Sequence, residues 1–409
     1  MCLQKNLGIN YELKLPLILI HTPFGLKFFD KVANSRLGKI YATLNIYLMP
    51  LITALAVFLI MGSLLVIFSN DSAREGIREI GPQGNLLIPG LNPILPWTYG
   101  WIGLVITIII HEAGHGVVAR VYNTKVESTG IVLFLGIPIG AFVNIQQDEL
   151  NKTTFKQKSA ILTAGPLNNM ILAGISLGLL FLLVSSLTPI SHIKGNETGI
   201  TVLTVGENSL AKSIGLSKNS LITHINAESI EDVQELRTML RDSLGTTIQI
   251  RWTTEDGMEQ IKSLKLPPSI PQSKGVLGVT LTDAFFDPTL VLNNYKNLFL
   301  TNPLAILMPP TLQQNLVPYS ESMSSYYSSS LFGPAFPYIA NLLFWIWFIN
   351  FNVGIFNALP ITMLDGGQWY GTLLENKIKT NRKIKPFTIL SIVFVIIVIL
   401  SFTLPWVLR

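Results

Sequence analysis

The sequence predicts an α-helical polytopic membrane protein with about five transmembrane helices, a membrane-associated β-hairpin and an inserted extracytoplasmic α/β domain. Only 13% of the 409 residues are charged and 49% are hydrophobic, whereas soluble globular proteins have about 25% charged residues. Five segments are apolar over about 20 residues or more, which is the length needed to cross a ~30 Å hydrocarbon core. These segments are residues 40–68, 97–121, 160–187, 336–359 and 387–406.

Basic residues at the ends of these segments predict the orientation of the chain. They cluster before the first segment, between the second and third, and between the fourth and fifth. Lysine and arginine are enriched in cytoplasmic loops. We therefore expect a cytoplasmic N-terminal segment, residues 1–39, and a C-terminus outside. The basic residues are Lys27, Lys31, Arg36, Lys39, Arg120, Lys125, Lys152, Lys156, Lys158, Lys377, Lys379, Arg382, Lys383 and Lys385.

Charge and cysteine content exclude several other classes of protein. The net charge of +5 is confined to the ends of apolar segments, so it gives no reason to invoke nucleic acid. The single cysteine, Cys2, excludes an internal disulfide and a cysteine-ligated zinc site. No cleavable signal peptide is evident, because the apolar run at residues 15–20 is short. The lack of targeting signals favours a prokaryotic plasma membrane.

A polar insertion separates the third and fourth segments, and it is expected outside the cytoplasm. Its first part, residues 199–282, has the pattern of an α/β module. Its second part, residues 283–335, contains prolines and a Ser/Tyr-rich run, which predicts a linker that lies partly on the surface. The remaining domains, residues 40–190 and 336–409, hold the apolar segments. In the α/β module the expected strands are 201–205, 221–226, 248–252 and 261–266, and the expected helices are 209–214 and 233–240.

The second apolar segment contains a pattern of metal ligands, His-Glu-Ala-Gly-His. His111 and His115 are four residues apart, so both imidazoles project from one face of a helix and can share a metal. Glu112 lies beside the first histidine and is the usual general base, which takes a proton from water at the metal. Residues 97–110 carry no charge. A hydrolytic metal site here implies cleavage of peptide bonds within the membrane.

Two histidines leave a tetrahedral zinc one protein ligand short. Asp365 is the best candidate for the third ligand, because an aspartate beside two glycines after an apolar run has few other partners in a membrane. His115 lies five residues before Arg120, about 8 Å along a helix, so it is near the cytoplasmic face. Asp365 follows the fourth segment, which ends on the same side. The other histidines are expected at other depths: His21, His192 and His224.

These motifs resemble those of a known family. HEAGH in one span, with Asn-x-x-Pro-x-x-x-x-Asp-Gly at residues 357–366, is similar to the motifs of the site-2 proteases, zinc enzymes that cut transmembrane segments. The resemblance implies His111, His115 and Asp365 as zinc ligands. It also implies Glu112 as the catalytic acid and base.

The resemblance implies further residues around the site. Asn357 is expected to line it and to stabilise a developing oxyanion, as a side-chain amide can. Asn169 matches the family's Gly-Pro-x-x-Asn element and is expected near the substrate. Either amide could instead satisfy the backbone between packed helices. Residues 130–144 resemble a membrane-dipping hairpin that pairs with unwound substrate, so Gly136 and Gly140 are also expected at the substrate.

The insertion resembles the PDZ domains of bacterial-type membrane proteases, through the sequence NSLAKSIGL followed by SLITHINAESI. The positions that are usually Ala-Ala and Gly-Asp read Leu210-Ala211-Lys212 and Asn219-Ser220 here, so binding of peptide tails stays open. The chain also departs from the family in an extra first span, an extra final span and the Ser/Tyr-rich run.

Together these features predict a zinc metalloendopeptidase of regulated intramembrane proteolysis, with Zn2+ as cofactor. The expected partners are transmembrane protein substrates, the lipid bilayer and peptide tails at the PDZ-like domain, with no nucleic acid. Two other classes are weighed against this. A non-catalytic scaffold would not need the intact Glu112. A metal transporter would show internal repeats and a full polar path, which the sequence lacks.

Overall fold

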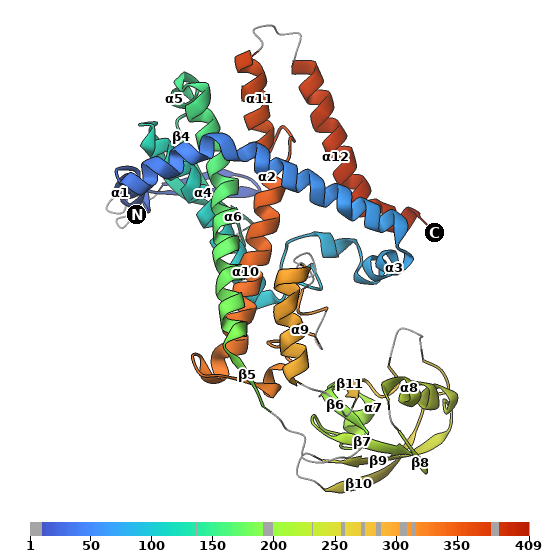
Figure 1. Ribbon diagram of the computed structural model, residues 1–409. Helices are drawn as coiled ribbons and strands as arrows, with labels where there is room; N and C mark the ends of the chain where they lie inside the picture. The colour runs from blue at the N-terminus through green and yellow to red at the C-terminus, as the bar shows by residue number, and fades with distance from the viewer. Residues whose placement is uncertain are drawn as a thin grey trace. The chain divides into compact units, whose positions relative to one another are not determined.

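The chain divides into two compact units, residues 1–180 with 341–409 and residues 181–340, and each unit is described by itself (Figure 1). The computed structural model describes residues 10–135, 137–190, 199–230, 232–254, 258–270, 275–283, 288–302, 309–312, 316–377 and 384–408.

Among the described residues, five helices are long and apolar enough to cross a membrane. They correspond one to one with the five predicted spans, which confirms this part of the predicted fold class. Their length follows from long, predominantly apolar sequence, since a helix satisfies its own backbone in lipid. The five helices are α2 (Arg36–Ser69), α4 (Trp97–Val121), α6 (Phe155–Ser185), α10 (Phe336–Asn357) and α12 (Ile384–Val407).

Polar side chains define both ends of α2. The hydroxyl of Ser35 accepts from the Gly38 backbone N–H at its start. Asn70 ends α2 and accepts from the Ala73 N–H, so it also begins α3, which the sequence analysis did not expect. Arg78 of α3 donates to backbone carbonyls at the end of α12. The shorter helices of this unit are α1 (Leu26–Ala33), α3 (Asp71–Ile80), η1 (Pro82–Asn85) and α5 (Gln147–Lys152).

A four-stranded antiparallel sheet belongs to the same unit as the catalytic motifs. The predicted hairpin is present as β3 and β4, and it is longer than residues 130–144. The sequence analysis expected residues 1–39 to be a cytoplasmic segment and predicted no strands in it. In the structure, this segment adds two strands to the hairpin. The order is β1-β2-β3-β4, so β4 is an edge strand, and it lies against α4. The strands are β1 (Asn10–Lys14), β2 (Leu17–Thr22), β3 (Val126–Phe134) and β4 (Ile137–Ile145).

The second unit contains the predicted α/β module. Every strand and helix expected in it is present, in a sheet of order β10-β9-β7-β6-β11 with β8 beside β7. Its core is apolar and includes Leu236, Ile250 and Trp252, each at most 1% exposed. The elements are β6 (Ile200–Val205), α7 (Leu210–Ser213), β7 (Leu221–Ile225), β8 (Glu228–Ser229), α8 (Val233–Asp242), β9 (Thr247–Thr253), β10 (Glu259–Lys265) and β11 (Val279–Asp283).

The described part of the Ser/Tyr-rich run is packed, whereas the sequence analysis expected a linker lying partly on the surface. Tyr319, Tyr326 and Tyr327 are all buried. Each phenol bonds within this unit, for example Tyr319 with the Tyr295 hydroxyl at 2.8 Å. Tyrosine combines a large apolar ring with one polar group, so a satisfied hydroxyl allows complete burial. Burial also raises the pKa of Tyr295 and Tyr319 above the ordinary value.

Two short strands join the ends of this unit. β5 (Leu187–Pro189) follows α6, and β12 (Tyr327–Ser329) comes shortly before α10. They pair antiparallel, which ties the chain leaving one long helix to the chain entering the other. The other helices here are α9 (Pro288–Thr301), η3 (Ser324–Tyr326) and η4 (Gly333–Ala335).

Candidate metal centre

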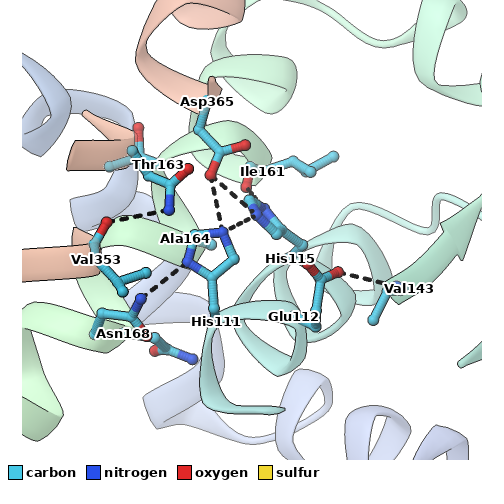
Figure 2. Close-up of polar contacts among 12 residues, drawn as sticks. His111, Glu112, His115, Val143, Ile161, Thr163, Ala164, Asn168, Val353 and Asp365 are labelled. Atoms are coloured by element: carbon cyan, nitrogen blue, oxygen red, sulfur yellow. Dashed lines mark hydrogen bonds and ion pairs between the residues drawn. The ribbon is translucent and has the colours of Figure 1, made fainter. Parts of the chain in front are cut away.

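Helix α4 presents both predicted histidine ligands on one buried face. His111 and His115 are each 9% exposed. Figure 2 shows the two rings and Asp365 pointing toward one another. Asp365 is the first residue of α11 (Asp365–Lys377), which begins after the loop at residues 358–364. Among the described residues, these three side chains form the group that could hold a metal ion.

The three candidate ligand atoms form a nearly equilateral triangle. The Asp365 Oδ2 atom lies 3.0 Å from His111 Nε2 and 3.3 Å from His115 Nε2. The two Nε2 atoms are 3.3 Å apart. In a tetrahedral zinc site with bonds of about 2.0–2.1 Å, ligand atoms lie about 3.3 Å from one another. The triangle therefore has the size of one face of a zinc tetrahedron.

The tautomer of His115 shows why this triangle suits a cation. Its Nδ1 lies 2.7 Å from the Ile161 carbonyl oxygen, which can only accept, so Nδ1 carries the proton. In the neutral form of the ring, the Nε2 lone pair then faces the aspartate. Asp365 Oδ2 is buried, and among the described residues its polar neighbours are the two Nε2 atoms. Lone pairs that face one another in a buried site repel, and a bound cation turns that repulsion into attraction.

Asn169 contacts the other histidine. It is fully buried, and its amide lies 3.0 Å from His111 Nδ1. With the amide nitrogen at this position, the Asn169 oxygen has no partner. Turned by 180°, the amide accepts from His111 Nδ1 and leaves Nε2 free for a metal. The contact orients a ligand candidate; the predicted contact with substrate stays a prediction.

Glycines allow the surrounding backbone to approach the ligands. A Cβ atom on Gly165 of α6 would lie 2.7 Å from His111 Nε2 and would also meet the His115 ring. The Cβ atoms of Gly366 and Gly367 would collide with carbonyl groups of the loop at residues 358–364. The Gly-Pro and Asp-Gly-Gly motifs are thus explained by close packing around the site.

Glu112 is held beside the ligands by the edge of the sheet. Its Oε2 accepts from the Val143 backbone N–H at 2.9 Å (Figure 2). Because β4 is an edge strand, this N–H is not used within the sheet. The carboxylate of Glu112 is thus fixed between the ligand group and β4 (Figure 2).

The remaining predicted residues are placed as follows. The Asn357 amide donates to the Val353 carbonyl of its own helix at 3.1 Å, which leaves its role toward substrate a prediction. Gly140 lies in β4, and among the described side chains a Cβ there would touch that of Val132. Gly136 lies outside the described residues, as does His192. His21 lies in β2 and His224 in β7, apart from the group that could hold a metal.

The sequence analysis assigned no role in the site to Asn168 or Tyr41. The Asn168 amide donates to the Ile110 carbonyl, one residue before His111, and accepts from the Tyr41 hydroxyl at 2.6 Å. A polar residue in an apolar span was the available signal. Tyr41 in α2 carried no comparable signal, because its partner is 127 residues away.

The sequence of this chain is similar to those of a peptidase family and of several individual proteins. The sequence model of Peptidase family M50 matches residues 99–401. A protein of Methanocaldococcus jannaschii described as uncharacterized is 24% identical over 85% of this chain and 75% of its own length. A Clostridium acetobutylicum protein named "Putative zinc metalloprotease" is 26% identical over 64% of this chain and 81% of its own length. A Rickettsia conorii protein of the same name is 26% identical over 73% of this chain and 97% of its own length.

Solved structures are similar over a smaller region. The PDZ domain of an SdrC-like protein from Listeria monocytogenes is 25% identical, with a TM-score of 0.19, over 22% of this chain and 93% of that structure. The corresponding domain from Listeria innocua is 27% identical, with a TM-score of 0.18, over 22% of this chain and 97% of that structure.

Proposed function

Since the chain belongs to peptidase family M50, the site-2 protease family, we propose that it cleaves peptide bonds inside transmembrane segments of other membrane proteins. Family membership makes it a metallopeptidase, and its five apolar helices make it a multi-pass membrane protein. The proposal concerns where it cuts and which residues do so.

One observation carries the proposal. His111, His115 and Asp365 converge in one buried group, and both histidines lie within a helix apolar enough to cross a membrane. Glu112 is adjacent, and its carboxylate is held by Val143. Metal binding by these three side chains and proton transfer by Glu112 can thus occur at one place within the membrane.

We assign the proton transfers to Glu112. Zinc held by His111, His115 and Asp365 would supply a Lewis acid that polarises the peptide carbonyl and lowers the pKa of water. Glu112 accepts the proton from the attacking water and then delivers it to the departing amine. The hydrogen bond from Val143 keeps the carboxylate beside the reacting atoms through both transfers.

Asn357 is proposed to stabilise the oxyanion. One amide hydrogen is directed to the Val353 carbonyl. A side-chain amide carries a second N–H, and this donor is free to meet the negative charge that develops on the carbonyl oxygen.

The substrate is proposed to bind as a strand along the free edge of β4. Because the Val143 N–H points away from β3, the backbone groups of Ala141, two residues earlier, point to the same edge. A strand added there would satisfy its own backbone in the membrane. Gly140 has no side chain to obstruct this approach.

We propose that the α/β module acts on a substrate before the transmembrane segment of that substrate is cleaved. In this proposal the protein resides in a prokaryotic plasma membrane, and its α/β module lies outside the cytoplasm, where it docks or filters substrates whose outer parts have been trimmed. Its PDZ-like sequence supports this role. Deletion of residues 199–268 should relax selectivity for trimmed substrates, and unchanged selectivity would contradict the filter.

The central test compares wild type with Glu112→Gln on a model transmembrane substrate, with bound zinc quantified in both. We expect about one zinc per chain in each protein and cleavage by wild type alone, because the amide cannot accept the proton. Cleavage that survives in Glu112→Gln would overturn the assignment of the base. A wild type that binds no zinc would overturn the metal site, and with it the distinction from a scaffold.

A further inference from the structure

The loop that precedes Asp365 packs against α2 and α12, two helices that carry none of the catalytic motifs. Residues 358–364 connect the end of α10 with the start of α11. The side chains of Leu359, Ile361 and Leu364 pack into one apolar cluster with Ala56 of α2 and Val398 of α12. The position of the third metal ligand therefore depends on a short irregular segment that packs against both α2 and α12.

One polar contact fixes the beginning of this loop. Thr53 of α2 is 7% exposed, and its hydroxyl lies 2.7 Å from the Ala358 carbonyl oxygen. Carbonyls at the end of a helix lack a partner within the helix. Such a group must be satisfied at membrane depth, where water is scarce. Thr53 can also donate to Met49 within α2, so its contact with the loop is not needed to satisfy Thr53 itself.

A second polar contact fixes the loop three residues before Asp365. The Ser391 hydroxyl of α12 is 3% exposed and accepts from the Thr362 backbone N–H at 2.9 Å. It also lies 3.1 Å from the Thr362 hydroxyl. The two contacts come from different helices and hold different points of the loop. Together they restrict its position relative to α2 and α12, and α2 in turn packs against α4.

We propose that Thr53 and Ser391 are positioning residues that hold the Asp365 carboxylate at the distance from His111 and His115 that a metal requires. The two histidines are spaced by their own helix, whereas Asp365 can move with its loop. A misplaced third ligand weakens metal binding more than it changes the metal-free fold. This inference rests on the proposed metal site and assigns a role to residues of α2 and α12.

The test measures metal affinity of the purified full-length protein, by Co2+ titration followed by competition with Zn2+. Thr53→Val keeps the shape and removes the hydroxyl, and Ser391→Ala removes the acceptor. We expect each variant to bind Zn2+ about 10- to 100-fold more weakly, which is the usual effect of removing a group that orients a ligand. The tetrahedral Co2+ absorption band should weaken as well. Thr53→Ser and Ser391→Thr keep the hydroxyl and should restore the affinity.

Matched controls separate positioning from general destabilisation. Thr107 of α4 and Ser401 of α12 also bear hydroxyls bonded within their own helices. Thr107→Val and Ser401→Ala should therefore leave the Zn2+ affinity within about twofold of wild type, and the thermal unfolding of all variants is compared.

The outcomes distinguish this inference from the proposed function. Wild-type affinity in both Thr53→Val and Ser391→Ala would overturn the inference and leave the metal site intact. Equal weakening in the controls would overturn it too, since it would reveal a general effect of lost hydroxyls. Failure of wild type to bind Zn2+ or Co2+ would overturn the proposed function itself.

Discussion

The two halves of the candidate metal centre are built in different ways. Helix α4 contributes His111 and His115 through a spacing of four residues, so one regular element sets their separation. Asp365 directly follows an irregular loop, residues 358–364, which is bonded to α2 and α12. The first half is local and rigid, and the second is assembled from distant parts of the chain. Substitutions in the two halves should therefore differ in how they affect metal binding and activity.

The largest effects should come from the ligands themselves. His111→Ala and Asp365→Ala should both abolish cleavage, because each removes one corner of the site. We expect weak residual Co2+ binding only in Asp365→Ala, since the histidine pair on α4 remains intact. Metal analysis and Co2+ absorption check this order. Stronger binding by His111→Ala would contradict the view that α4 is the preformed half.

A somewhat smaller loss of activity is expected from a substitution in α6, which packs against the two histidines of α4. Gly165→Ala places a Cβ against both imidazoles, and the backbone must shift to admit it. A displacement of about 1 Å at a catalytic site can lower the rate about 100-fold. Cleavage assays should show this loss. Gly174→Ala on the same helix is the control, because a Cβ there meets nothing within 4 Å, and its activity should match wild type.

The corresponding change in the loop half is Gly367→Ala. Its Cβ would lie 2.7 Å from the Thr362 nitrogen and would also meet the Ile361 carbonyl. We expect a loss of Zn2+ affinity of about tenfold, because a shift of the loop can relieve part of this clash. Zinc competition with a chelator measures this. Gly62→Ala in α2, which meets nothing within 4 Å, should bind like wild type. An unaffected Gly367→Ala would show that the loop is not tightly held.

The smallest effect is expected from a substitution that alters the orientation of one ligand. Asn169→Ala removes the amide beside His111 Nδ1 and should lower Zn2+ affinity about tenfold. Its activity at saturating zinc should recover, because the ligands all remain. Asn352→Ala is the matched control, since that amide bonds within its own helix. A loss of activity that zinc does not restore would instead support the predicted role of Asn169 at the substrate.

Much of the architecture was predictable because it depends on local patterns. Apolar length marked all five spans, and alternation marked the strands of the α/β module. The N-terminal strands were missed, because Leu17–Thr22 is short and its partner β3 begins more than 100 residues later. The buried tyrosines were missed as well, since a Ser/Tyr-rich run resembles a solvated loop until its ring partners are known.

The sequence by itself determined the two histidines, the adjacent glutamate and the candidate aspartate, because helical spacing and the scarcity of charge in the membrane restrict what such residues can do. Only the tertiary structure decided what holds them: the Ile161 carbonyl on His115, Asn169 on His111 and Val143 on Glu112. These partners are 46, 58 and 31 residues away. No local period relates such distant positions, and the packing of the helices and the sheet brings them together.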